Sequence, residues 1–124
     1  MPVLHRPIEP THELPGAQFT SLATPSNGSL DVAVWEVRLT PGHPGTAHRL
    51  TRHEVFVATA GRAIATLDGR PHQVATGDCL VVPPDTELTL EPAGDEGFTA
   101  LCLLPADGKA VTGDGEPFTP AWAV

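Results

Sequence analysis

Glycine and proline punctuate this chain so densely that long helices have few places to form. The 124 residues include 12 glycines and 14 prolines, about a fifth of the total, and they divide the apolar residues into short runs. The clearest turn is Asp68-Gly69, which lies between two alternating segments and is typical of a β-hairpin. The runs predict about eight strands, at residues 19–22, 30–39, 55–60, 63–67, 72–75, 79–82, 88–90 and 98–104. The expected fold is therefore all-β, a sandwich or barrel with little helix.

The strand expected at residues 30–39 has an ambiguous phase. Apolar residues would lie on both of its faces, with Leu30, Val32 and Val34 on one and Trp35, Val37 and Leu39 on the other. Either both faces of this strand are covered, or a bulge shifts its register.

Length and composition predict one domain with less regular ends. A chain of 13.0 kDa is long enough for one compact core and too short for two ordinary ones. Residues 1–17 contain four prolines and are expected to form an extended arm or edge segment. Residues 18–105 should form the barrel. In the polar tail at residues 106–124, Phe118 and Trp122 are expected to pack on the barrel or on a second subunit.

Net charge and the length of the apolar runs limit the partners and the cellular compartment that we expect for the chain. Seven Lys and Arg against 15 Asp and Glu give a net charge of -8, so nucleic acid and anionic membranes are not expected to bind. The chain has no apolar run of about 20 residues and its start lacks the apolar core of a secretory signal, so we expect a cytoplasmic protein. Cys79 and Cys102 lie in separate apolar runs and are interpreted as two reduced, buried thiols.

The densest group of chemistry-bearing residues lies in segment 42–61. Here His43, His48, His53 and Glu54 fall between a Gly/Pro turn and a strand. Imidazole nitrogens and a carboxylate are ligands for Zn, Fe, Ni or Mn. A histidine and a carboxylate within hydrogen-bond reach also form a general acid/base pair. The alternatives without function are a solvated loop, or a buried pair that only fixes the loop.

Five residues of this segment have a distinctive spacing, namely Gly42, His48, Leu50, Glu54 and Gly61. A second segment, residues 77–84, runs from Gly-Asp through an apolar strand to Pro-Pro. The two segments and the gap between them resemble the two conserved motifs of the cupin superfamily, over roughly residues 30–104. The resemblance implies a small jelly-roll barrel.

The departures from the cupin pattern concern its metal site. The usual cupin set is three histidines and one glutamate, and only His48 and Glu54 stand at matching positions. Leu50 and Leu88 occupy two of the histidine positions, and Asp85 occupies a glycine position. Leucine cannot bind a metal, so the resemblance implies a degenerate site with two protein donors.

Three other histidines are candidates to complete that site, namely His53, His43 and His72. His53 directly precedes Glu54, and adjacent residues on a strand point to opposite faces, so the two cannot easily bind one ion. A turn between His48 and Glu54 would relax that rule, and the expected cofactor is then at most a divalent transition metal (Zn, Fe, Ni or Mn) at His48, Glu54 and His53.

The two leucines also make the barrel interior more apolar. An apolar pocket for a small organic ligand is expected to be lined by Trp35, Leu50, Phe56, Leu88 and Cys102. The competing interpretation is that these residues simply fill the barrel. Nothing near Cys102 in the sequence lowers its pKa, so a nucleophilic role is not expected.

Three functions remain open from the sequence. The first is binding of a small organic molecule in the barrel, with metal-independent acid/base chemistry of an isomerase or cyclase type at His48 and Glu54. The second is a metal-dependent cupin enzyme, such as a dioxygenase or isomerase, with an unorthodox His/Glu site. The third is a non-catalytic ligand sensor or accessory protein acting as a homodimer, which pairs through sheet edges or terminal segments.

Overall fold

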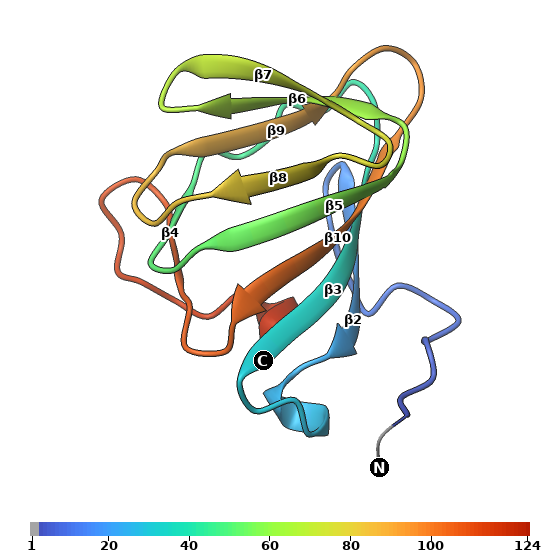
Figure 1. Ribbon diagram of the computed structural model, residues 1–124, viewed down its shortest axis with the longest axis vertical. Helices are drawn as coiled ribbons and strands as arrows, with labels where there is room; N and C mark the ends of the chain where they lie inside the picture. The colour runs from blue at the N-terminus through green and yellow to red at the C-terminus, as the bar shows by residue number, and fades with distance from the viewer. Residues whose placement is uncertain (1–2) are drawn as a thin grey trace.

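The computed structural model describes residues 3–124 and consists almost entirely of strands (Figure 1). The elements in chain order are β1 (His12–Leu14), β2 (Ala17–Ala23), η1 (Pro25–Asn27), β3 (Val32–Leu39), β4 (Arg49–Leu50), β5 (Glu54–Ala60), β6 (Arg62–Leu67), β7 (Arg70–Ala75), β8 (Cys79–Val82), β9 (Leu88–Pro92), β10 (Phe98–Pro105), β11 (Ala110–Val111) and η2 (Ala121–Ala123), where η marks a 3-10 helix. The all-β prediction is confirmed, since every expected strand is present. The sequence analysis missed β4 and β11, which are only two residues long, and left β1 inside the expected arm.

The strands form a jelly roll from a large and a small sheet. The large sheet has the order β1-β2-β3-β10-β5-β8, the small one β7-β6-β9, and β11 pairs with β4. Strands distant in sequence lie side by side, as β3 and β10 do in Figure 1. The inner faces of both sheets contribute to one buried cluster, with Trp35, Phe56 and Cys102 from the large sheet and Ala65 and Val74 from the small one. Among residues 3–124 no helix has the length and apolar character required to cross a bilayer.

The phase of β3 is resolved by its pairing. Ala33, Trp35 and Val37 are buried, whereas Val32 and Val34 lie on the outer face. A bulge is present opposite, in the β2 pairing between Ser21 and Ala23, but β3 itself alternates regularly. The strand is ambiguous in sequence because the outer face of its sheet is apolar too.

The prediction that both cysteines are buried is wrong for Cys79. Cys79 and Cys102 are both free thiols, but Cys79 is exposed and only Cys102 is buried. Strand alternation explains the difference, because β8 directs Val82 into the core and Cys79 and Val81 away from it. An apolar run on the edge strand of a sheet therefore gives no assurance of burial.

Both ends of the chain contact the large sheet. Arg6 forms an ion pair with Glu36 of β3, at 2.7 Å between Nη2 and Oε1. Near the other end, the ring of Trp122 stacks on Phe19 with centroids 3.6 Å apart. Phe118 forms a β-bridge with Ala110 and is nearly half exposed.

Candidate functional site

Glu54 is a buried carboxyl group without a hydrogen-bond partner. It is the first residue of β5, where it pairs with Val82 of β8, and strand alternation directs its side chain to the interior with Phe56. Its residual exposure is 4%. Among the buried side-chain polar atoms of residues 3–124, Glu54 Oε1 alone lacks a partner. Since buried polar groups are nearly always paired, this atom marks an unusual position.

Burial also sets the protonation state of Glu54. Loss of solvation disfavours the charged carboxylate and raises the pKa of Glu54 from 4.5 to about 8. At neutral pH the side chain is therefore mostly a neutral carboxylic acid, with one O–H donor and acceptor capacity on both oxygens. The interior of the barrel thus holds a carboxylic acid that keeps its proton at neutral pH.

His48 lies at the rim of the same interior. It forms a β-bridge with Leu88, in which His48 N–H donates to the Leu88 carbonyl at 3.1 Å and Leu88 N–H donates back at 2.8 Å. Directly paired residues share a face, and Leu88 is buried, so His48 is on the interior side of the wall. Its imidazole is half-buried.

A backbone contact selects the tautomer of His48. Nδ1 is 2.9 Å from the carbonyl oxygen of Thr46. A carbonyl oxygen can only accept, so Nδ1 carries the hydrogen and the neutral ring keeps its lone pair on Nε2. This contact comes from loop geometry, and no sequence signal marks Thr46. The available base is therefore Nε2.

His48 and Glu54 are on the same side of the barrel wall but are not hydrogen-bonded to each other. Glu54 is within the core and Oε1 has no partner, while the one hydrogen bond of the His48 ring goes to Thr46. A direct acid/base pair, one of the sequence expectations, is therefore not formed. A ligand or water between the two groups would be needed to couple them.

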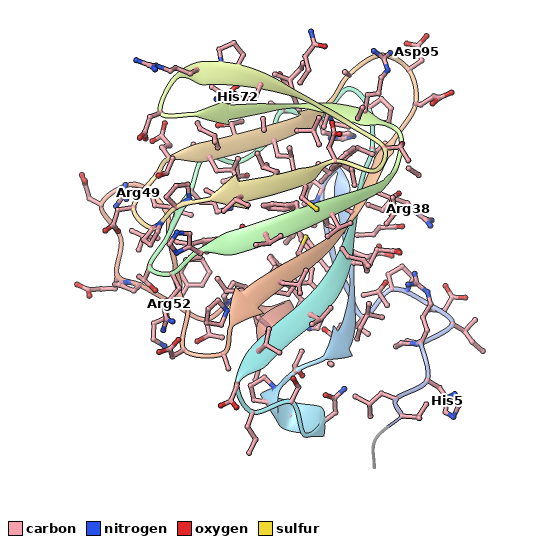
Figure 2. The ribbon with its side chains drawn as sticks, in the orientation of Figure 1. His5, Arg38, Arg49, Arg52, His72 and Asp95 are labelled. Carbon is pink, nitrogen blue, oxygen red and sulfur yellow. The ribbon has the colours of Figure 1, made fainter. Side chains whose placement is uncertain are left out.

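The donor set does not fit a transition-metal site of three or more protein ligands. Within residues 3–124 no group of three or more His, Cys, Asp or Glu side chains is placed to hold an ion. His53 is exposed, which separates it from Glu54 as alternation requires. His43 is exposed in the loop before β4, and His72 is exposed on β7 (Figure 2). The candidates to complete the site therefore lie elsewhere on the surface.

The residues expected to line a pocket are core residues that pack against one another. Their exposures do not exceed 5%, and all belong to the buried cluster, namely Trp35, Leu50, Phe56, Leu88 and Cys102. The two described cavities lie elsewhere. One, of about 300 Å³, is lined by Gly42, His43, Pro44, Glu91 and Pro92. The other, of about 90 Å³, lies between the N-terminal arm and the strands β2 and β3. The interior of the barrel is therefore filled by these apolar side chains, as close packing of a protein core requires.

Cys102 is unsuited to nucleophilic chemistry in this setting. Burial raises its pKa well above the ordinary value, and the charges of Glu54 and Glu36 raise it further. The thiol therefore stays protonated. Two arginines of the first motif bind other groups of the chain, since Arg52 pairs with Asp107 and Arg49 donates to the Gly113 carbonyl. Figure 2 shows both arginines on the β4 side of the molecule.

Comparisons with known proteins agree on the family and the fold. The family described as the cupin domain matches residues 35–104. Dimethylsulfoniopropionate lyase DddW of Ruegeria pomeroyi is 40% identical over 58 residues, which are 47% of this chain and 38% of the lyase. The oxalate decarboxylase of Bacillus subtilis, studied for its Mn(II) centres, is 26% identical, with a TM-score of 0.71 over 84% of this chain and 29% of that protein. A cupin-like protein of Thermotoga maritima is 19% identical, with a TM-score of 0.69 over 81% of this chain and 79% of that one, a likeness of fold alone. The chain thus spans well under half of the lyase and of the decarboxylase.

Proposed function

The chain belongs to the cupin family, as the match over residues 35–104 shows, and from this premise we propose that it binds a small organic molecule through the buried carboxyl of Glu54. The observation that carries the proposal is the unpartnered Glu54 Oε1 in a largely apolar interior. Leaving a buried polar group unpaired costs about 1–3 kcal/mol, which a ligand that pairs with it would recover. A neutral carboxylic acid donates best to a carbonyl or carboxyl oxygen, so the ligand is expected to bear one.

The same two groups support proton transfer without a metal. With a carbonyl ligand between them, Nε2 of His48 removes a proton from the carbon next to the carbonyl, breaking C–H and forming N–H. The Glu54 carboxyl donates its proton to the carbonyl oxygen, and the ligand becomes an enol. Return of a proton to a different carbon or face gives an isomer and restores both residues. Isomerisation or cyclisation is therefore the reaction class we propose, and binding without turnover would instead support a ligand sensor.

Access to Glu54 is proposed to lie at β4. This strand is two residues long, pairs with the equally short β11, and is followed by a bend that leads to Glu54. Outside that pairing, the His48–Leu88 bridge ties the segment to β9, Asp85 N–H donates to the Leu50 carbonyl and Thr51 N–H donates to the Lys109 carbonyl. Because β4 and β11 form a two-stranded sheet outside the two larger ones, this part of the wall should open at a lower free-energy cost than the central strands, so a ligand would enter here.

The experiment compares ligand binding by the wild type, Glu54→Gln and Glu54→Leu in a thermal-shift screen of small carbonyl compounds and carboxylic acids. Compounds that stabilise the wild type should also stabilise Glu54→Gln, whose amide N–H still donates, but not Glu54→Leu. Turnover of any such compound should fall by at least about 100-fold in Glu54→Gln, because an amide cannot give up its proton in the same way. Equal binding by Glu54→Leu would overturn the proposal.

A second candidate is a metal-dependent enzyme, favoured by the likeness to a decarboxylase with Mn(II) centres. Against this candidate, only His48 and Glu54 are available as protein ligands, and two ligands bind a metal ion weakly. We expect purified protein to contain well under one equivalent of transition metal by elemental analysis, and chelation to leave its melting temperature unchanged. One equivalent of metal that is lost in His48→Ala would establish the second candidate instead.

A further inference from the structure

The cavity of about 90 Å³ between the N-terminal arm and the large sheet is lined mainly by polar side chains. On the sheet, two cross-strand pairs of β2 and β3 form its wall, namely Gln18 opposite Arg38 and Thr20 opposite Glu36. These residues alternate with Phe19 and Val37, which are in the core, so they lie on the outer face of the sheet. The arm contributes Arg6 and Pro10. The volume is sufficient for several waters or for one small organic ion.

The carboxylate in this cavity is already neutralised within the chain. Arg6 donates from Nη2 to Glu36 Oε1 at 2.7 Å and from Nη1 to Glu36 Oε2 at 3.2 Å. This two-pronged contact uses both carboxylate oxygens, and it leaves the Glu36 side chain only 17% exposed. The same contact holds the arm against β3, so one wall of the cavity is fixed by a charge pair.

The second guanidinium of the cavity, that of Arg38, has no such partner. The two ion pairs within residues 3–124 are Arg6–Glu36 and Arg52–Asp107, and Arg38 belongs to neither. Arg38 is exposed, and Figure 2 shows it on the side of the molecule along which the N-terminal arm runs. With Arg6 and Glu36 neutralising each other, the cavity retains one positive charge on a chain whose net charge is -8.

The hydroxyl of Thr20 is a further free group in the cavity wall. Thr20 is only 5% exposed because the arm covers it. The hydroxyls of Thr11 and Ser21, which are close by, donate to the carbonyls of Phe19 and Trp122. Within residues 3–124 the Thr20 hydroxyl forms no comparable hydrogen bond. Covered polar groups are nearly always paired, so this hydroxyl is available to a molecule in the cavity.

We propose that this cavity binds a small carboxylate through Arg38 and Thr20. A planar carboxylate matches the donor fork of a guanidinium, and its single charge balances the one that Arg38 leaves uncompensated. A phosphate group carries about -1.5 to -2 at pH 7 and would leave excess negative charge beside Glu36. The cavity shares no residue with the barrel interior, so this proposal is independent of the one made for Glu54.

The experiment titrates 15N-labelled protein with sodium acetate, while sodium chloride keeps the ionic strength constant. The backbone amide signals of Gln18 and Arg38 should shift to saturation, with a dissociation constant on the order of millimolar for so small a ligand. Arg38→Gln should raise this constant by at least about 10-fold, and Thr20→Val by about 3- to 10-fold. The matched control is Arg70→Gln, at an exposed arginine of β7, which changes the net charge equally and should leave the constant unchanged.

Three results would contradict the proposal. The first is the absence of saturable shifts at the two signals in the wild type. The second is equal acetate binding by the wild type and Arg38→Gln, with the fold of the variant verified by its circular-dichroism spectrum. The third is saturation of the same signals by sodium phosphate at lower concentrations than acetate. Acetate binding that is lost in Glu54→Leu but kept in Arg38→Gln would place acetate in the barrel, which supports the proposed function and not this site.

Discussion

The Glu54→Gln variant is expected to lack a pH dependence of stability that the wild type shows. In the wild type, ionisation of Glu54 should lower the free energy of unfolding by up to about 5 kcal/mol between pH 4.5 and pH 8. The folded state keeps the Glu54 proton up to about pH 8, whereas the unfolded state releases it near 4.5. Between these values the folded state binds one more proton than the unfolded state. Stability therefore falls as the pH rises, by about 1.4 kcal/mol per pH unit.

The measurement is urea unfolding at pH 5, 7 and 9 for the wild type and Glu54→Gln. The difference between the two curves isolates Glu54 from the other titrating groups. The free energy of unfolding of the wild type minus that of Glu54→Gln should be several kcal/mol larger at pH 5 than at pH 9. The control is Glu91→Gln, the same substitution at an exposed glutamate of β9, which should not reproduce the effect of Glu54→Gln. Parallel curves for the wild type and Glu54→Gln would show that Glu54 is solvated, and the candidate site would lose its basis.

The double variant Leu50→His, Leu88→His is expected to bind about one equivalent of Mn or Zn, where the wild type holds little. Both leucines are buried on the interior side with His48 and Glu54, at the positions where the cupin resemblance implies histidines. Without metal, two imidazoles in a core built for leucine should cost about 2–5 kcal/mol of stability. Metal at 100 times its dissociation constant should restore about 2.7 kcal/mol.

Calorimetric titration with metal and melting curves with and without it check this outcome. The control adds Glu54→Gln to the double variant, which removes the one anionic ligand and should weaken binding strongly. If the double variant gains no metal-dependent stabilisation, the four positions do not converge. The degenerate-site interpretation of the wild type would then be wrong as well.

The candidate site was predictable only in part. The spacing of the first motif identified His48 and Glu54, and strand alternation correctly placed His53 and Glu54 on opposite sides. The sequence did not indicate that Glu54 lacks a partner, because partners come from strands that are distant in the chain. It also could not distinguish a hollow barrel from a filled one, since both require the same apolar residues.

The sequence by itself determined the all-β class, the eight principal strands and the family, because turn residues, alternation and motif spacing are local properties. Only the tertiary structure decided which face of each strand is buried. Val34 and Trp35 are both apolar, yet Trp35 is buried in the core and Val34 lies on the outer face of the large sheet. The same cause raises the pKa of Glu54 and exposes Cys79. Desolvation and packing depend on long-range strand pairing, which local patterns do not specify.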